Sequence, residues 1–221
     1  MIYTIYSKPK VGKTTLSLAD APKGKTAIIN ADQGLIGIDT TGFTVVDDMG
    51  SAALNKQVLS PAFLKKHNRI VVDTATSLYD AFLSECAGGR PPSQQNYGQA
   101  NTGFAAFLRV LRQADKEIIV LCQEKMVMPT EDWVSDDDDE ETTASVTVDL
   151  PPGAAKTLLT MSDAIGRLYI ANVNERSLRR LWLTPTPNIV AGARSRVYLG
   201  RPPYLAKPSI GRLNNLLGWN R

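Results

Sequence analysis

The chain has 221 residues, of which 43% are hydrophobic and 21% charged, values that indicate one globular domain or a core with a small appendage. No apolar run approaches the roughly 18 to 20 residues that a membrane-spanning helix needs, and the first ten residues lack the charged and then apolar layout of a signal peptide. We therefore expect a cytoplasmic protein without membrane contact. The two cysteines, Cys86 and Cys122, have no partners at metal-binding spacing, so the sequence predicts reduced, buried thiols.

The net charge of +3 is distributed unevenly along the chain. Residues 1–141 hold 14 Lys and Arg against 19 Asp and Glu, a net charge of −5, whereas residues 142–221 hold 11 against 3, a net charge of +8. A basic carboxyl-terminal third indicates a polyanionic partner. An ordinary solvated basic surface would have the same composition, so both interpretations stay open at this point.

Short β-branched or apolar runs alternate with helix-like segments through the first part of the chain. This alternation predicts an α/β fold, in which βαβ units build a mostly parallel sheet with helices on both faces. The predicted strands are Ile2–Tyr6, Lys25–Asn30, Phe43–Val46, Arg69–Asp73 and Glu117–Cys122. The longest predicted helix is Tyr97–Lys116, whose aromatic side chains recur at helical spacing and are interpreted as core.

The later part of the chain predicts additional strands in the same domain. We divide the sequence into a core at residues 1–127, an acidic mobile loop at 128–145 and a basic part at 146–221 that completes the sheet. The loop contains the acidic run Asp136–Glu141, which favours a solvated spacer, although a gate that mimics DNA is an alternative. The basic part contains a predicted helix, Gly153–Ala164, and predicted strands Ile165–Ala171 and Leu178–Thr184.

A phosphate-binding loop is predicted where the first strand meets the first helix. In such a P-loop, backbone N–H groups converge on the phosphates, a lysine reaches the β and γ oxygens, and a hydroxyl coordinates magnesium. The full pattern begins with a glycine where this chain has Ser7, which predicts a different first turn of the loop and puts its affinity in doubt. The predicted ATP-binding residues are Ser7, Lys8, Pro9, Lys10, Val11, Gly12, Lys13, Thr14 and Thr15.

A magnesium site is predicted from the strand Arg69–Asp73, which ends in a carboxylate as a Walker B strand does. A hard cation beside phosphates needs one or two oxygen ligands from the protein, and Thr14 with Asp73 meets that need. The alternative is that Asp73 only caps the helix that follows near Thr74.

Two further residues carry a resemblance to RecA-like ATPases. Asp32 follows the second strand in Asn30-Ala31-Asp32-Gln33-Gly34, and Gln123 follows the strand that ends at Cys122. The resemblance implies that Asp32 orients or deprotonates the attacking water and that Gln123 senses the γ-phosphate, with Lys13 completing the catalytic set. Asp is shorter than the family's usual Glu, which implies slow hydrolysis.

The resemblance extends over most of the chain to the short, core-only RecA-like proteins of phages, grouped with the Sak single-strand annealing proteins and regarded as minimal recombinases. The motifs that carry it, in order, are Lys8–Thr14, Tyr97-Gly98, Asp149–Gly153, Ser162–Leu168 and Ala193–Arg196. It implies a RecA-like P-loop core, an ATPase that depends on DNA, and a location in the host cell cytoplasm.

The resemblance also implies partners. In RecA-like filaments and rings the nucleotide lies between subunits, and basic residues of a neighbour complete the site; Arg194 and Arg196 match that position, where the family usually has Lys-x-Arg. Single-stranded DNA is the implied polyanion, and a single-strand binding protein is a further implied partner. The candidate phosphate contacts are Arg176, Arg179, Arg180, Arg201, Lys207 and Arg212, which the sequence does not rank.

Two other functions are compatible with these residues. Lys8 occupies the place of the signature lysine in the deviant P-loop ATPases that act as partition or positioning switches, although Pro9 and Lys10 replace the glycines of that class. The chain could also be a module whose nucleotide pocket stabilises the fold without turnover. A switch would lose nucleotide-linked dimerisation when Lys8 is changed, and a module would bind ATP without hydrolysing it.

Overall fold

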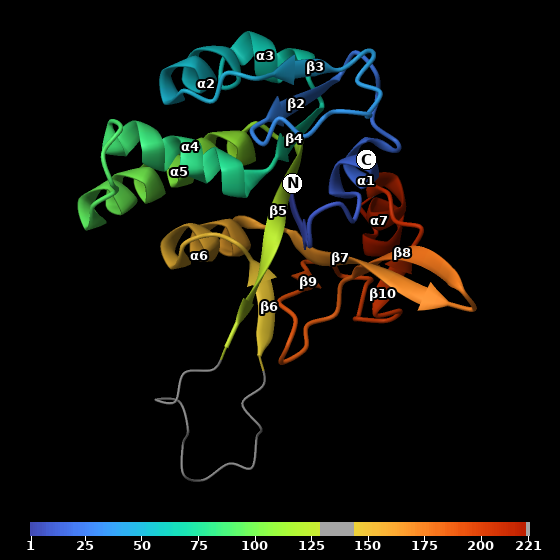
Figure 1. Cartoon of the computed structure of the whole chain (residues 1–221). Coiled ribbons are helices and arrows are strands. Elements are labelled where there is room, and N and C mark those ends of the chain that lie inside the picture. Colours follow the sequence, from blue (N-terminus) through green and yellow to red (C-terminus); the bar gives the residue numbers. More distant parts are fainter. Residues whose placement is uncertain (129–143, 220–221) are drawn as a thin grey trace, which may run out of the picture.

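A twisted, mostly parallel sheet runs through the middle of the molecule, with helices on both faces (Figure 1). The computed structural model describes residues 1–128 and 144–219. The strand order along the sheet is β10-β8-β7-β1-β5-β4-β2-β3, while β6 pairs with β5 and β9 with β7. The strands are β1 (Ile2–Ser7), β2 (Thr26–Asn30), β3 (Thr44–Val46), β4 (Arg69–Asp73), β5 (Glu117–Val127), β6 (Ser145–Val148), β7 (Ala164–Val173), β8 (Arg176–Trp182), β9 (Gly192–Ala193) and β10 (Tyr204–Ala206).

The parallel strands all bring their carboxyl ends to one edge of the sheet. Strand β1 pairs in parallel with both β5 and β7, and β4 pairs in parallel with β5 and β2. Antiparallel pairing is confined to the added strands, including the β7–β8 hairpin and the pair of β6 with the end of β5. Strand β5 therefore separates β1 from β4, and the carboxyl ends of β1 and β4 lie beside Leu121 to Gln123 of β5 at the same edge.

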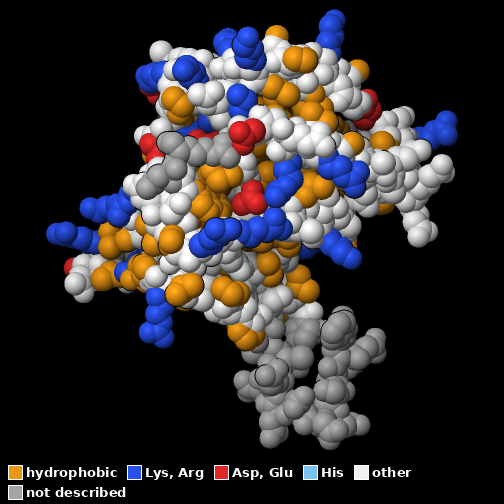
Figure 2. Space-filling view, turned by 180° about the vertical axis from the view of Figure 1, so that it is seen from behind, with side chains coloured by type: hydrophobic (Ala, Val, Ile, Leu, Met, Phe, Trp, Pro, Cys, Tyr) orange, Lys and Arg blue, Asp and Glu red, His pale blue; other side chains and the backbone are white. Residues whose placement is uncertain are grey.

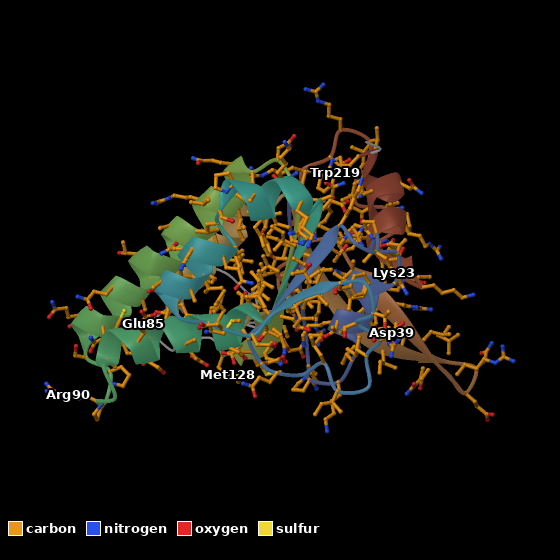
Figure 3. The ribbon with its side chains drawn as sticks, turned by 90° about the horizontal axis from the view of Figure 1, so that it is seen from above. Lys23, Asp39, Glu85, Arg90, Met128 and Trp219 are labelled. Carbon is orange, nitrogen blue, oxygen red and sulfur yellow. The ribbon has the colours of Figure 1, made fainter. Side chains whose placement is uncertain are left out.

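Two hydrophobic layers cover the sheet because successive side chains of a strand point to opposite faces. In β5, Ile118 and Val120 join the layer under α4 (Ala75–Ala87), α5 (Gln94–Gln113) and α6 (Pro152–Met161), whereas Ile119 and Leu121 join the layer under α1 (Lys13–Leu18) and α7 (Ile210–Leu217). Helices α2 (Ser51–Gln57) and α3 (Pro61–Lys66) lie near β3. Viewed from above, Glu85 and Arg90 lie at the end of the α4–α5 pair, and Trp219 lies on the α7 side (Figure 3).

The structure confirms the predicted α/β fold with added carboxyl-terminal strands, and its differences from the predicted boundaries have local causes. Helix α5 begins at Gln94 rather than Tyr97, because Ser93 and Asn96 form a capping box there. Strand β5 continues beyond Cys122 to Val127, because Glu124 to Val127 pair with β6. The predicted acidic loop lies mostly at 129–143, outside the described residues, as does the whole run Asp136–Glu141.

Within the described ranges 1–128 and 144–219, no helix has both the length and the apolar character that crossing a membrane requires.

Candidate functional site

The predicted P-loop lies where β1 passes into α1. Ser7 is the last residue of β1, pairs in register with Gln123 and is buried. The backbone turns instead at Lys10, with φ 62°, and at Gly12, with φ 100°, and α1 starts at Lys13. The conformational freedom of glycine is therefore needed at Gly12 and not at Ser7, which explains how a serine occupies the first position of the loop.

The Lys13 ammonium is buried under the loop, with its side chain 6% exposed. Its hydrogen-bond acceptors in the described residues are neutral oxygens: Gln123 Oε1 at 3.1 Å, Ser7 Oγ at 3.3 Å, the Ser7 carbonyl at 3.4 Å and the Lys8 carbonyl at 3.5 Å. Burial lowers the pKa of Lys13, and the nearby charge of Asp73 opposes this shift. A buried cation surrounded by neutral oxygens is well placed to receive an anion such as a phosphate.

The carboxylate at the end of β4 contacts the helix that follows the loop. Thr14 Oγ1 donates a hydrogen bond of 2.5 Å to Asp73 Oδ2, and Asp73 is 2% exposed. Burial raises the pKa of Asp73 to about 6, and the charge of Asp32 adds to the rise, whereas the Thr14 hydrogen bond and Lys13 lower it. The pair fits the hard oxygen donors that Mg²⁺ prefers, and phosphate oxygens and water would supply the other ligands of a cation held by Thr14 and Asp73.

Asp32 follows β2 and lies at the same edge of the sheet. Its backbone N–H donates to the Asp73 carbonyl at 3.2 Å, and its Oδ1 accepts from the Gly34 N–H at 3.0 Å. The side chain is exposed, and its charge reaches both Asp73 and Lys13. The structure thus brings Asp32 beside the loop, with its carboxylate open to solvent.

Gln123 lies between the P-loop, which follows β1, and Asp73, which ends β4, because β5 is inserted between these two strands. Its side chain faces Lys13, and its backbone is fixed on both sides: its N–H donates to Thr76 Oγ1 at 3.3 Å, and its carbonyl accepts from the Asp149 N–H at 2.8 Å. The amide is therefore held beside the ammonium on a rigid strand.

Arg194 and Arg196 lie away from the P-loop of their own chain. Arg194 contacts Asp163 Oδ1 at 3.4 Å and the Thr160 carbonyl at 2.7 Å. Asp163 also accepts from the N–H of Ile2, the first residue of β1, whereas the P-loop follows the last one. Arg194 is thus at the edge of the sheet opposite its own phosphate loop, and Arg196 is exposed in the segment that follows.

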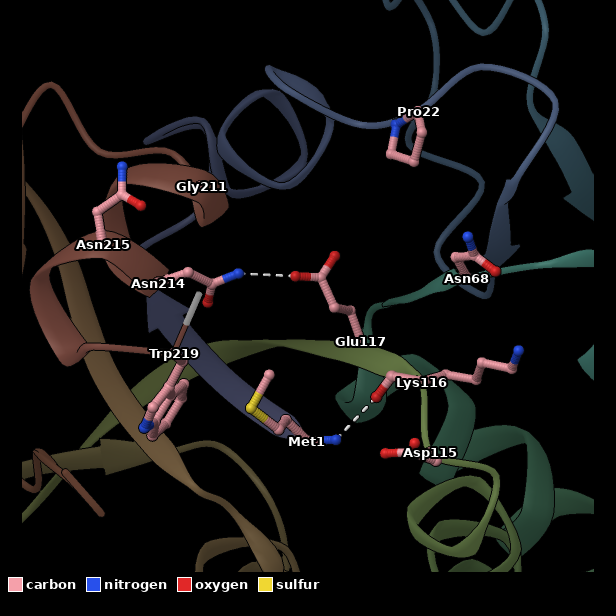
Figure 4. A pocket seen from close by; sticks show the side chains of 10 residues that line it. All are labelled: Met1, Pro22, Asn68, Asp115, Lys116, Glu117, Gly211, Asn214, Asn215 and Trp219. Carbon is pink, nitrogen blue, oxygen red and sulfur yellow. Dashed lines mark hydrogen bonds between the residues drawn. The ribbon is translucent and has the colours of Figure 1, made fainter. Parts of the chain in front are cut away.

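The same opposite edge carries a polar cavity of about 470 Å³, drawn in Figure 4. Asn214 Nδ2 donates to Glu117 Oε1 at 2.8 Å there, and the Met1 amino group donates to the Lys116 carbonyl at 2.8 Å. Trp219 packs edge-on against Tyr3 beside it. Met1 and Lys116 precede the parallel strands β1 and β5, and Glu117 begins β5, so the cavity is at the end of the sheet away from the P-loop.

One residue beside the loop could not be placed from the sequence. Arg179, on β8, donates from Nε to the Val11 carbonyl at 2.9 Å, although the sequence distinguished it only as one of six basic candidates for DNA contact. Figure 2 shows Lys and Arg side chains projecting from the side of the molecule where the β7–β8 hairpin lies. No pattern in the sequence distinguishes Arg179 from the other basic candidates, because its place beside the loop depends on the pairing of β8 with β7, next to β1.

One family of known proteins matches most of this chain. Residues 1–195 match the model of the family described as AAA domain. Among solved structures, a KaiC-like protein from the hyperthermophilic archaeon Pyrococcus horikoshii OT3 is similar over 82% of this chain and 76% of that chain, with 9% identity and a TM-score of 0.47. The sequence has no match among curated proteins. Because the family model spans most of the chain, from β1 to beyond β9, the chain belongs to the AAA-domain family and is a P-loop NTPase.

Proposed function

We propose that this protein binds ATP with Mg²⁺ at the P-loop and hydrolyses it slowly, in a reaction stimulated by single-stranded DNA, and that it promotes DNA recombination by annealing or strand exchange. The observation that carries the nucleotide part is the convergence of Lys13, Gln123, Thr14 and Asp73 at one edge of the sheet. The described residues leave the Lys13 ammonium among neutral acceptors, so a γ-phosphate would complete its environment.

Each residue of the site has one proposed task. Lys13 and the loop amides bind the β and γ phosphates, Gln123 contacts the γ-phosphate, and Asp32 orients or deprotonates the attacking water. Thr14 and Asp73 hold the Mg²⁺, which when bound neutralises charge on the phosphates. Burial of Lys13 and Asp73 strengthens these interactions, because a low local dielectric weakens screening by water.

The nucleotide part is tested by calorimetry on two lysine variants of the same loop. Lys13→Ala removes the buried ammonium and is expected to weaken ATP binding by about 10- to 100-fold, the usual cost of losing a hydrogen bond to a charged group. Lys8→Ala is the matched control, because it removes only an exposed side chain of the same loop and leaves the phosphate-binding backbone amides in place. Equal affinities of the two variants would contradict the proposed site, and loss of nucleotide-linked dimerisation in Lys8→Ala would favour the switch class.

The proposed DNA contact rests on the charge of the carboxyl-terminal third. Residues 142–221 have a net charge of +8, and β8 carries Arg176, Arg179 and Arg180, of which Arg179 contacts the P-loop. Arg180 lies over the ring of Tyr204 at 4.2 Å, on the face of β8 opposite Arg179, so the hairpin carries positive charge on both faces. Such a surface would bind a phosphate backbone mainly through charge, and stacking would add to it.

ATP hydrolysis should be measured with and without single-stranded DNA, together with DNA affinity at several salt concentrations. The logarithm of the affinity is expected to fall linearly with that of the salt concentration, with a slope of about 0.7 for each phosphate contacted. An Arg176→Ala/Arg180→Ala variant should lower this slope. If the wild-type protein shows no DNA affinity at low salt, the DNA part of the proposal is wrong while the ATP part still stands.

We also propose that a neighbouring copy supplies Arg194 and Arg196 to the nucleotide, in a filament or a ring. Arg194 lies at the sheet edge opposite its own loop, so only another subunit could bring it to a phosphate. Mixing Lys13→Ala protein with Arg194→Ala/Arg196→Ala protein tests this. Each variant alone should be inactive, and the mixture should regain activity because some interfaces pair an intact loop with intact arginines; no gain would contradict shared sites.

A further inference from the structure

Asn30, the last residue of β2, has a buried amide oxygen that receives no hydrogen bond from the described residues. The side chain is 8% exposed. Within residues 1–128 and 144–219, its Oδ1 is the one buried side-chain nitrogen or oxygen without a partner. A buried acceptor without a donor costs free energy, and native proteins contain few of them. The oxygen therefore identifies a place for a donor that the described side chains do not supply.

The direction of this oxygen follows from the other half of the amide. Asn30 Nδ2 donates to Asp47 Oδ1 at 2.7 Å, and Asp47 follows β3. Only the NH₂ group of an amide can donate to a carboxylate, so this bond fixes which side of the planar group is nitrogen. Because β2 lies between β3 and β4, the nitrogen is on the β3 side and the oxygen is on the β4 side.

Asp73 is the residue of β4 beside that oxygen. Asn30 and Asp73 are partners in the parallel register of β2 and β4. Paired residues of neighbouring strands point to the same face of a sheet, and the strands are about 4.8 Å apart. The Asp73 carboxylate accepts from Thr14 Oγ1 at 2.5 Å, so this face is the one that carries the start of α1. The Asn30 amide oxygen therefore lies beside the predicted magnesium site.

The groups that meet there are acceptors in need of a shared donor. At pH 8, above the Asp73 pKa of about 6, neither the carboxylate nor the Asn30 oxygen can donate to the other. A water molecule has two O–H donors and can satisfy both. Among the described residues no three acidic, histidine or cysteine side chains form a metal cluster, so a cation here depends on oxygens from water, hydroxyl and phosphate. Mg²⁺ usually keeps several of its waters when it binds.

We propose that Asn30 is a positioning residue of the magnesium site. Its Oδ1 and the Asp73 carboxylate together accept from one water that is a ligand of Mg²⁺ in the nucleotide complex, and Asp47 orients the Asn30 amide for this task. The inference rests on the proposed function, because it needs Mg²⁺ and a nucleotide at the P-loop. It extends the metal site from β4 to the ends of β2 and β3.

Titration calorimetry at pH 8 with a non-hydrolysable ATP analogue, in Mg²⁺ and in a chelator, tests the role of Asn30. Asn30→Ala should reduce the gain in affinity that Mg²⁺ gives by about 10- to 100-fold, the usual cost of losing an outer-shell group, and should leave the affinity in chelator unchanged. Asn55→Ala, at an exposed position of α2, is the control.

An unchanged gain in Asn30→Ala would overturn the inference, and the proposed function would still stand if Asp73→Asn loses the gain. A wild type that binds the analogue equally well in Mg²⁺ and in chelator would contradict both the inference and the magnesium part of the proposed function.

A second pair of variants separates the oxygen of Asn30 from its bond to Asp47. Asn30→Asp removes the donor to Asp47 but keeps an acceptor oxygen, so it should retain the magnesium gain that Asn30→Ala loses. Asp47→Ala should lower the gain by less than Asn30→Ala does, because the amide oxygen remains but is no longer oriented. Asp48→Ala, at the next residue, should not change it. Equal losses in Asn30→Asp and Asn30→Ala would show that Asn30 only supports the end of β2 through Asp47, and the inference would be wrong.

Discussion

Gln123 Oε1 accepts a hydrogen bond of 3.1 Å from Lys13 Nζ, joining two residues that are 110 positions apart in the chain. The bond connects Gln123 of β5, which pairs in register with the last residue of β1, to the start of α1. A γ-phosphate that approaches Lys13 would therefore meet the Gln123 amide at the same time, and its arrival would release the amide oxygen from the ammonium.

Gln123→Ala should lower the rate of ATP hydrolysis by about a hundredfold, as the loss of one preorganised polar contact to the reacting group does. ATP affinity should change little, because Lys13 and the loop amides remain. Steady-state hydrolysis and calorimetry measure the two quantities separately. Gln95→Ala, at an exposed position of α5, is the control. A variant that loses affinity and rate equally would show that Gln123 only supports the loop.

Asp73→Asn should remove the effect of magnesium on ATP affinity. The carboxylate accepts a hydrogen bond from Thr14 and would hold the metal through a bound water, and changing such an outer-shell group costs about 10- to 100-fold in metal affinity. Calorimetry with Mg²⁺ and with a chelator checks this. Asp80→Asn, on the exposed side of α4, should keep the wild-type dependence on magnesium. The same loss in both variants would exclude a specific role for Asp73.

Asp32→Asn should slow hydrolysis by about 10²- to 10⁴-fold, the usual contribution of a general base, without weakening ATP binding. A matched control exists, because Asp48 Oδ1 accepts from the Gly50 N–H at 3.0 Å just as Asp32 Oδ1 accepts from the Gly34 N–H. Asp48→Asn perturbs the same type of turn away from the site and should stay active. If both variants hydrolyse ATP at the wild-type rate, the base lies elsewhere.

The stability of the ligand-free protein should depend on pH through His67. This buried ring contacts the Phe63 carbonyl and Thr44 Oγ1, each at 2.9 Å, and burial lowers its pKa below the usual 6.5. As the pH falls, His67 is therefore protonated in the unfolded chain before it is protonated in the folded protein. Its contribution to stability is complete above pH 6.5 and is lost as the pH falls through the folded pKa.

Asp73 titrates in the same range with the opposite sign, because its pKa is raised to about 6 and its contribution to stability is lost as the pH rises from about 4 to 6. The pH dependence of the wild-type unfolding free energy therefore contains the contributions of both His67 and Asp73. Urea unfolding of the wild type and of His67→Asn at pH 5, 6 and 8 separates them. Their difference in unfolding free energy should shrink toward pH 5, and a difference that is constant with pH would contradict the assignment.

The amino-acid sequence was sufficient to predict the features whose residues are contiguous in the chain. The strand before Ser7, the Gly12-Lys13-Thr14 turn and the helix after it depend on local backbone preferences and hydrogen bonds within one short segment. The alternation of strands and helices determined the α/β class in the same way, because side-chain periodicity is local. The acid at the end of β4 was also predictable, as a polar residue that closes a buried strand.

The strand ends that lie next to one another could be identified only from the three-dimensional structure. The position of β5 between β1 and β4 puts Gln123 against Lys13, and the hairpin next to β1 brings Arg179 to Val11, 168 residues earlier in the chain. It also put Arg194 at the edge opposite its own loop. The order and register of strands follow from how buried faces and backbone hydrogen bonds are satisfied across the whole sheet, which no local pattern of residues specifies.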